Sequence, residues 1–103
     1  MDRNAPIAGL APVHPGALLA EVLASLPQGK SEISRLLKIS RPALDKILKE
    51  VSAISPAMAL KLGKLFGQAP EFWLNLQMQY DLKVAGAAMA AELEQIPTLQ
   101  VAA

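Results

Sequence analysis

Proline, glycine and serine residues divide this chain into short segments, and within each segment apolar residues recur every three or four positions. Such spacing places apolar side chains on one face of an α-helix. The breaks are themselves helix signals, because serine favours the N-cap, proline the first turn and glycine the C-cap. Alanine and leucine also greatly outnumber isoleucine and valine. The chain is therefore predicted to be an all-α bundle.

Five helices are expected, over residues 17–26, 32–37, 41–50, 56–66 and 70–85. Ser31, Ser40 and Ser55 are the predicted N-caps, and Gly67 is a predicted C-cap. One face of the last helix carries Phe72, Trp73, Leu76, Tyr80 and Val84. Aromatic rows at helical spacing are more often core than binding surface, so Phe72 and Trp73 are assigned to the core and part of this helix to a dimer interface.

The short loops predict one bundle without separate domains. Residues 1–15 are expected to be a flexible N-terminal arm ending in the turn His14-Pro15-Gly16, and residues 16–85 the folded domain. Residues 86–103 form an Ala-rich tail that is expected to be either partly helical or disordered. Its helix would cover residues 87–94, after an interruption at Gly86. A core built from so short a chain is small, so a second subunit is expected to complete it.

Several classes of protein are excluded by what the sequence lacks. It contains no cysteine, no GxGxxG or GxxxxGK[ST] motif, and a single histidine in a turn-forming context. No enzyme activity, metal or cofactor is therefore expected. No apolar run is long enough for a membrane span, and the interrupted N-terminus lacks the pattern of a signal peptide, so a cytoplasmic protein is predicted.

Charge is sorted along the chain although the formal net charge is only +1. Residues 28–66 contain eight Lys and Arg against three Asp and Glu, a net charge of +5, whereas the two flanks total −4. The basic middle segment suits nucleic acid and the acidic remainder suits a basic partner.

Two short helices in the basic segment have the layout of a helix-turn-helix. The apolar positions that this motif buries are filled by Ile33, Leu37, Ile39, Leu44 and Ile47, and Ser34 stands where the helices cross. The recognition helix then exposes Arg41, Pro42, Asp45 and Lys46 to base edges, with Arg41 the best candidate for a bidentate contact to guanine. Lys30, Ser40 and Lys49 are placed for phosphates.

Each of these residues has an alternative interpretation. Arg41 and Lys46 could be ordinary solvated charges, and the flanking motif is what favours DNA contact. Asp45 either accepts from cytosine N4 or pairs within the helix with Arg41 or Lys49, and the pair is favoured. Pro42 removes one backbone donor from the helix start, while its fixed φ suits that position.

Three stretches resemble HigA-type antitoxins, small Xre-class helix-turn-helix proteins of bacterial toxin–antitoxin modules. They are His14-Pro15-Gly16, KSEISRLLKISRPALDKIL from Lys30, and ISPAMALKLGKLFGQAPEFWLNLQMQYDLKVA from Ile54. The most specific part is PEFWLNLQMQYDL from Pro70, which generic Xre repressors lack. The resemblance implies a homodimer that neutralises a toxin of the RelE-like fold, an mRNA interferase, and represses its own operon at a palindrome.

The sequence departs from the family pattern at several positions. Lys30 occupies the position at which the family usually has Gln, and Lys38 occupies the position of the Gly in its turn. Where the family has Ser- or Thr-type residues on the recognition helix, this sequence has Pro42, Ala43 and Asp45. Lys38 is therefore expected in a left-handed conformation that costs about 1–2 kcal/mol. Two alternatives stay open: a stand-alone Xre-type regulator without a toxin, and an antitoxin that has lost DNA binding.

Overall fold

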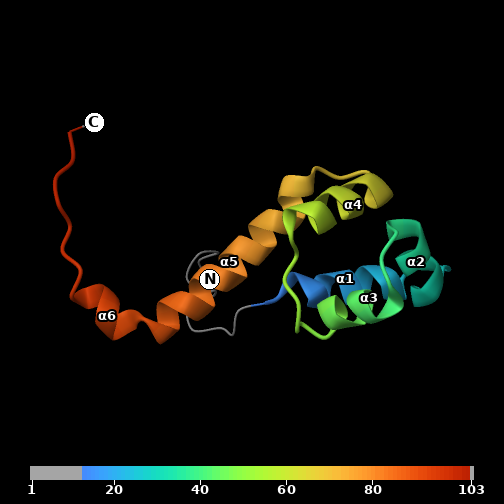
Figure 1. The fold of residues 1–103 in the computed structure, drawn as a ribbon, viewed down its shortest axis with the longest axis horizontal. Coiled ribbons are helices and arrows are strands. Elements are labelled where there is room, and N and C mark those ends of the chain that lie inside the picture. Colours follow the sequence, from blue (N-terminus) through green and yellow to red (C-terminus); the bar gives the residue numbers. More distant parts are fainter. Residues whose placement is uncertain (1–12, 103) are drawn as a thin grey trace, which may run out of the picture.

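The computed structural model describes residues 13–102, which form six helices and no strand. In chain order these are α1 (Pro15–Ala24), α2 (Lys30–Leu37), α3 (Arg41–Leu48), α4 (Pro56–Phe66), α5 (Pro70–Ala88) and α6 (Ala90–Glu94). Helices α1 to α4 gather at one end of the molecule, and α5 leads away from them to α6 and the C-terminal tail (Figure 1). The all-α prediction is confirmed, and α6 lies within residues 87–94, the part of the tail for which helix was one of two expectations.

The helix caps agree with the sequence at three of four positions. Ser40 Oγ accepts from the backbone N–H of Ala43, Ser55 Oγ accepts likewise at the start of α4, and Gly67 ends α4 with a φ of 67°. The predicted cap at Ser31 is wrong. Gly29 is the N-cap of α2, because its carbonyl already accepts from the N–H of Ile33 at 3.0 Å.

Helix α1 begins two residues earlier than predicted. The Gly16 N–H donates to His14 Nδ1 at 2.9 Å, so His14 is the N-cap and the expected turn is the first turn of the helix. His14 is only 3% exposed, and its ring packs in a T-shaped arrangement against the Tyr80 ring, with the two ring centroids 4.9 Å apart. Its imidazole thereby joins α1 to α5. Residues 1–12 of the predicted arm lie outside the described residues.

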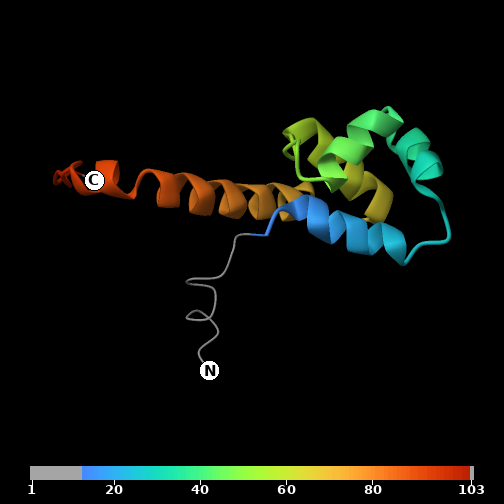
Figure 2. The same cartoon turned by 90° about the horizontal axis from the view of Figure 1, so that it is seen from below.

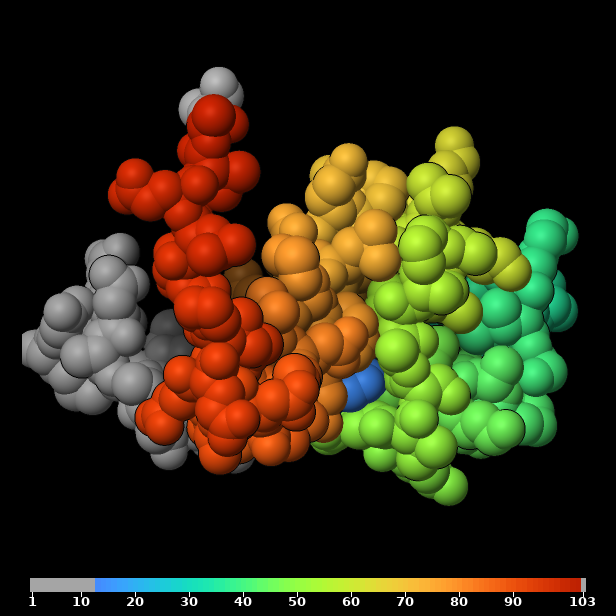
Figure 3. Space-filling model, turned by 60° about the vertical axis from the view of Figure 1, so that its left-hand side comes forward, coloured from blue at the N-terminus to red at the C-terminus, as the bar shows by residue number. Residues whose placement is uncertain are grey.

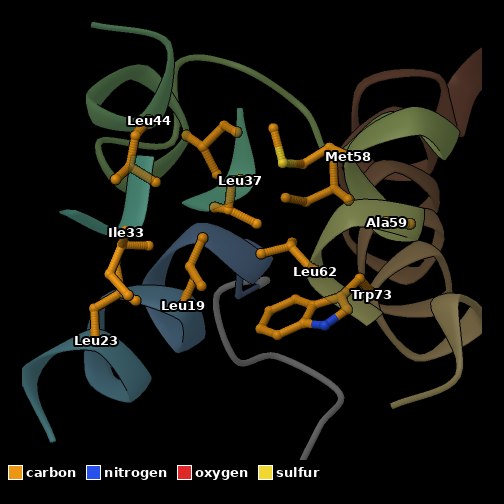
Figure 4. Close-up of a cluster of buried hydrophobic side chains, with 11 residues drawn as sticks. Leu19, Leu23, Ile33, Leu37, Leu44, Met58, Ala59, Leu62 and Trp73 are labelled. Atoms are coloured by element: carbon orange, nitrogen blue, oxygen red, sulfur yellow. The ribbon is translucent and has the colours of Figure 1, made fainter. Parts of the chain in front are cut away.

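The hydrophobic core lies between the first four helices and the beginning of α5 (Figure 4). Its buried members are Leu19, Leu23, Ile33, Leu37, Leu44, Ile47, Ile54, Met58, Ala59, Leu62 and Trp73. The predicted core position of Trp73 is confirmed, and its indole N–H donates to Gln68 Oε1 at 2.9 Å. Burying an aromatic ring with its polar edge satisfied stabilises the α4–α5 corner.

Helix α5 differs from the prediction in two respects. Phe72 is 41% exposed and packs edge-on against Trp73, so its assignment to the core is wrong; the neighbouring Trp73 takes the inward position. The helix also continues through Gly86 to Ala88, and the break before α6 falls at Met89. Figure 2 shows the second half of α5 standing clear of the other helices. Within a single chain, this half of α5 therefore has few tertiary contacts with the helical bundle.

One buried polar side chain fastens α5 to the loop after α3. Gln77 is 5% exposed, accepts from the Ile54 N–H at 2.8 Å and donates to Asp81 at 3.0 Å. Both ends of its amide are thus satisfied, as a buried amide requires. Across residues 13–102 no helix has the length and apolar character to cross a membrane.

Candidate nucleic-acid interface

Helices α2 and α3 form the predicted helix-turn-helix. Four of its expected apolar positions are buried in the core, Ile39 is half-buried, and Ser34 is 5% exposed between the helices. The Ser34 hydroxyl donates to the carbonyl of Ser31 at 2.8 Å, so this close crossing leaves no polar group unpaired. The register deduced from the sequence is confirmed, and it determines which residues α3 presents to solvent.

The turn between the two helices has the strained geometry expected. Lys38 has φ 57° and ψ 44°, the left-handed conformation that glycine adopts without a Cβ penalty. Its carbonyl accepts from Lys61 Nζ of α4 at 3.2 Å. A second left-handed residue, Glu50 with φ 64°, lies in the loop directly after α3.

The first turn of α3 carries the polar cluster of the site. Arg41 is exposed, its Nε donates to Asp45 Oδ1 at 3.1 Å, and its Nη1 donates to Ser31 Oγ of α2 at 2.8 Å. Of the two pairs predicted for Asp45, the structure contains the one with Arg41. The Ser31 contact was missed, because residues ten apart show no sequence pattern and Ser31 had been assigned as a cap.

The other predicted contact residues stand on the same two helices. Lys30 is the first residue of α2, Pro42 the second of α3, Lys46 lies one turn further, and Lys49 is the C-cap of α3. All four are exposed, as is Ser40. The structure brings Arg41, Asp45 and Ser31 into direct contact, and it leaves the lysines free to meet a polyanion. No group of three or more His, Asp or Glu side chains in the described residues is arranged to hold a metal ion.

The same arrangement of helices occurs in solved structures of known proteins. A HigA-family addiction module antidote protein from Coxiella burnetii aligns with a TM-score of 0.82 and 37% identity, covering 88% of this chain and 100% of that chain. The Pseudomonas aeruginosa antitoxin HigA, solved with the higBA promoter, aligns with a TM-score of 0.80 and 36% identity, covering 86% and 99%. The chain belongs to the HigA family.

Curated sequences agree with this assignment to the HigA family. Virulence-associated protein A' of Dichelobacter nodosus is 41% identical over 80 residues, which span 77% of this chain and 70% of that protein. Other relatives are described as HTH-type transcriptional regulators. No family model matches the chain. Antitoxins and DNA-binding regulators are not enzymes, and this HigA-family chain shares their helix-turn-helix fold.

Proposed function

We propose that this chain is an antitoxin and autorepressor, which binds a palindromic operator as a homodimer and neutralises a basic mRNA-interferase toxin of the RelE-like fold. The observation that carries the proposal is the exposed Arg41 at the start of α3, within a helix-turn-helix frame shared with an antitoxin solved on its promoter. Both partners, an operator and an mRNA-cleaving toxin, belong to the cytoplasm.

DNA recognition divides the exposed residues into two roles. We assign Arg41 to guanine O6 and N7, Lys46 and Pro42 to neighbouring base edges, and Lys30, Ser40 and Lys49 to phosphates. Asp45, which pairs with Arg41, lies beside these groups. The assignment follows from position, because the N-terminal turn of a recognition helix approaches base edges while the flanking residues meet the backbone. A bidentate arginine–guanine contact contributes about 1–3 kcal/mol of discrimination, whereas phosphate contacts contribute affinity without sequence preference.

Arg41→Ala and Lys49→Ala separate these two roles. Operator and random duplexes are titrated with each variant at several salt concentrations. Arg41→Ala should weaken operator binding about 5- to 150-fold more than random binding. Lys49→Ala should weaken both about equally and lower the salt slope by about one unit. Equal losses on both duplexes for Arg41→Ala would contradict the base-reading assignment.

The dimer is supported by an unpartnered apolar stripe that runs from the middle of α5 to its C-cap. Met78, Leu82 and Met89 are exposed at intervals of four and seven residues, and Met78 and Leu82 border a groove of about 430 Å³ that reaches Ile54. Figure 3 shows α5, in orange, at the surface between α6 and α4. A contiguous exposed apolar surface marks an interaction site, and a second copy of the chain would bury it and enlarge a small core.

The oligomeric state tests this interface directly. Leu82→Glu places a charge in the stripe and should give a monomer in sedimentation or light scattering, with operator affinity falling because two half-sites are no longer held together. Gln79→Glu introduces the same charge at a polar exposed position of α5 and should leave the dimer intact. A dimeric Leu82→Glu protein would place the interface elsewhere.

The toxin partner is supported by charge. Residues 67–103 carry Glu71, Asp81, Glu92 and Glu94 against Lys83, a net charge of −3 that suits a basic ribonuclease. A short basic reading frame directly beside this gene that stops growth when expressed alone would be the toxin, and its co-expression with this chain should restore growth and co-purify the two chains. Operator binding without such a partner would instead favour a stand-alone regulator, the description that several curated relatives carry. Neutralisation without any binding to its own promoter would identify an antitoxin that has lost DNA binding.

A further inference from the structure

The guanidinium of Arg41 is held at two points before any DNA arrives. Asp45 accepts from its Nε one turn along α3, and Ser31 accepts from its Nη1 across the turn from α2. We propose that Asp45 and Ser31 are positioning residues that orient Arg41 for guanine, and so determine operator specificity without touching a base. This inference rests on the proposed function, in which Arg41 reads a base.

The two contacts leave the recognition edge of Arg41 available. A guanidinium has five N–H donors, and the contacts to Asp45 and Ser31 use one on Nε and one on Nη1. The second Nη1 proton and both Nη2 protons remain. A bidentate contact to guanine O6 and N7 needs only two donors. The cluster therefore fixes the plane of the guanidinium and leaves the donors that a guanine requires.

Stability does not account for this cluster. The side chains of Arg41 and Asp45 are 43% and 35% exposed, and an ion pair that faces solvent contributes little to folding. Ordering one long side chain during association, by contrast, lowers affinity about 2- to 12-fold. An Arg41 that is already oriented avoids this loss on the operator, so the cluster favours binding at the correct base.

Asp45 also lowers the attraction of this surface for DNA in general. Its carboxylate lies against Arg41 and offsets one positive charge at the start of α3, which weakens binding to any phosphate backbone. This loss is the same on cognate and random DNA, so it leaves the ratio of the two affinities unchanged. The orientation of Arg41 is therefore what raises the ratio of operator affinity to random-DNA affinity.

The test measures that ratio for Asp45→Asn in the otherwise native protein and again in an Arg41→Ala background. The cognate duplex is selected from a random-sequence library by the native protein, and thermal unfolding confirms that each variant is folded. Asp45→Asn should lower the ratio about 2- to 12-fold in the native background and leave it unchanged when Arg41 is absent. Ser31→Ala should act in the same direction by a smaller factor.

Glu32→Gln is the matched control for charge. Glu32 lies in the first turn of α2, with its Oε2 3.8 Å from Arg35 Nη2. Glu32→Gln therefore removes one negative charge from the same basic segment, and the contacts of Arg41 stay in place. It should strengthen binding to cognate and random duplexes by the same factor and leave the ratio unchanged. A ratio that falls equally in Glu32→Gln would show that net charge, and not orientation, governs specificity.

The remaining outcomes separate this inference from the proposed function. The positioning role is overturned if Asp45→Asn leaves the ratio intact, or if it lowers the ratio by the same factor in the native and Arg41→Ala backgrounds. An equal loss in both backgrounds, together with lost discrimination at a cytosine, would assign Asp45 to direct reading of cytosine N4. If Arg41→Ala itself preserves the ratio, the base-reading assignment fails and the inference fails with it. If only Asp45→Asn behaves contrary to expectation, the proposed function still stands.

Discussion

Gly16→Ala is the substitution for which the structure predicts the largest effect on the DNA-binding frame. A Cβ built on Gly16 lies 2.0 Å from the carbonyl oxygen of Ile47 in α3 and 3.1 Å from His14 Nδ1. Ordinary contact begins at 3.4 Å, so α1 and α3 would have to separate by about 1.4 Å. The obstacle is backbone and cannot rotate away. A gap of that size removes most of the dispersion energy between facing side chains.

The expected cost is therefore at the upper end for overpacked cores, about 3 kcal/mol or more. Thermal unfolding followed by circular dichroism should show the melting temperature falling by roughly 12–24 °C. Operator affinity should fall as well, because Ile47 belongs to the recognition helix. A free energy of unfolding within about 0.5 kcal/mol of the native value, the range of ordinary surface substitutions, would refute the close approach of α1 to α3.

Gly86→Ala is the control for that experiment, since nothing lies within 4 Å of a Cβ at this helical position of α5; it should stabilise the protein by about 0.5–1 kcal/mol. Lys38→Gly should raise the melting temperature by relieving a left-handed residue, a gain of about 1–2 kcal/mol. Gln77→Ala should cost about 1–3 kcal/mol in urea unfolding, because the buried N–H of Ile54 loses its acceptor. Equal stability of Lys38→Gly and the native protein would contradict the strain at the turn.

Much of this fold follows from periodicity. The buried residues of α2, α3 and α4 recur at helical intervals, so the helix-turn-helix register and the exposure of Arg41 were correctly predicted. Caps at Ser40 and Ser55 were predictable because each serine precedes a proline or an apolar run. The left-handed Lys38 was expected from the glycine that it replaces.

The errors arise where tertiary contacts decide the outcome. Ser31 resembles a cap, yet Gly29 occupies that place and the Ser31 hydroxyl meets Arg41 of another helix. Adjacent residues of a helix point about 100° apart, and the sequence alone does not say that Trp73 is buried while Phe72 is exposed. His14 was assigned to a turn, because a capping histidine is recognisable only once Tyr80 is seen to cover it.

The separation of charge acquires a spatial meaning in this fold. The eight Lys and Arg side chains of residues 28–66 belong to α2, α3, α4 and the turns next to them, whereas the acidic residues after Gly67 lie on α5 and α6. Helix α5 alone is 19 residues long, about 28 Å, and carries its exposed end away from the recognition helix.

A basic toxin attracted to that end does not have to displace DNA. Neutralisation and repression should therefore be separable by mutation: Glu92→Gln with Glu94→Gln should weaken toxin capture in a salt-dependent manner and leave operator affinity unchanged, whereas Arg41→Ala should do the reverse. Loss of both activities in either variant would show that the two surfaces are coupled.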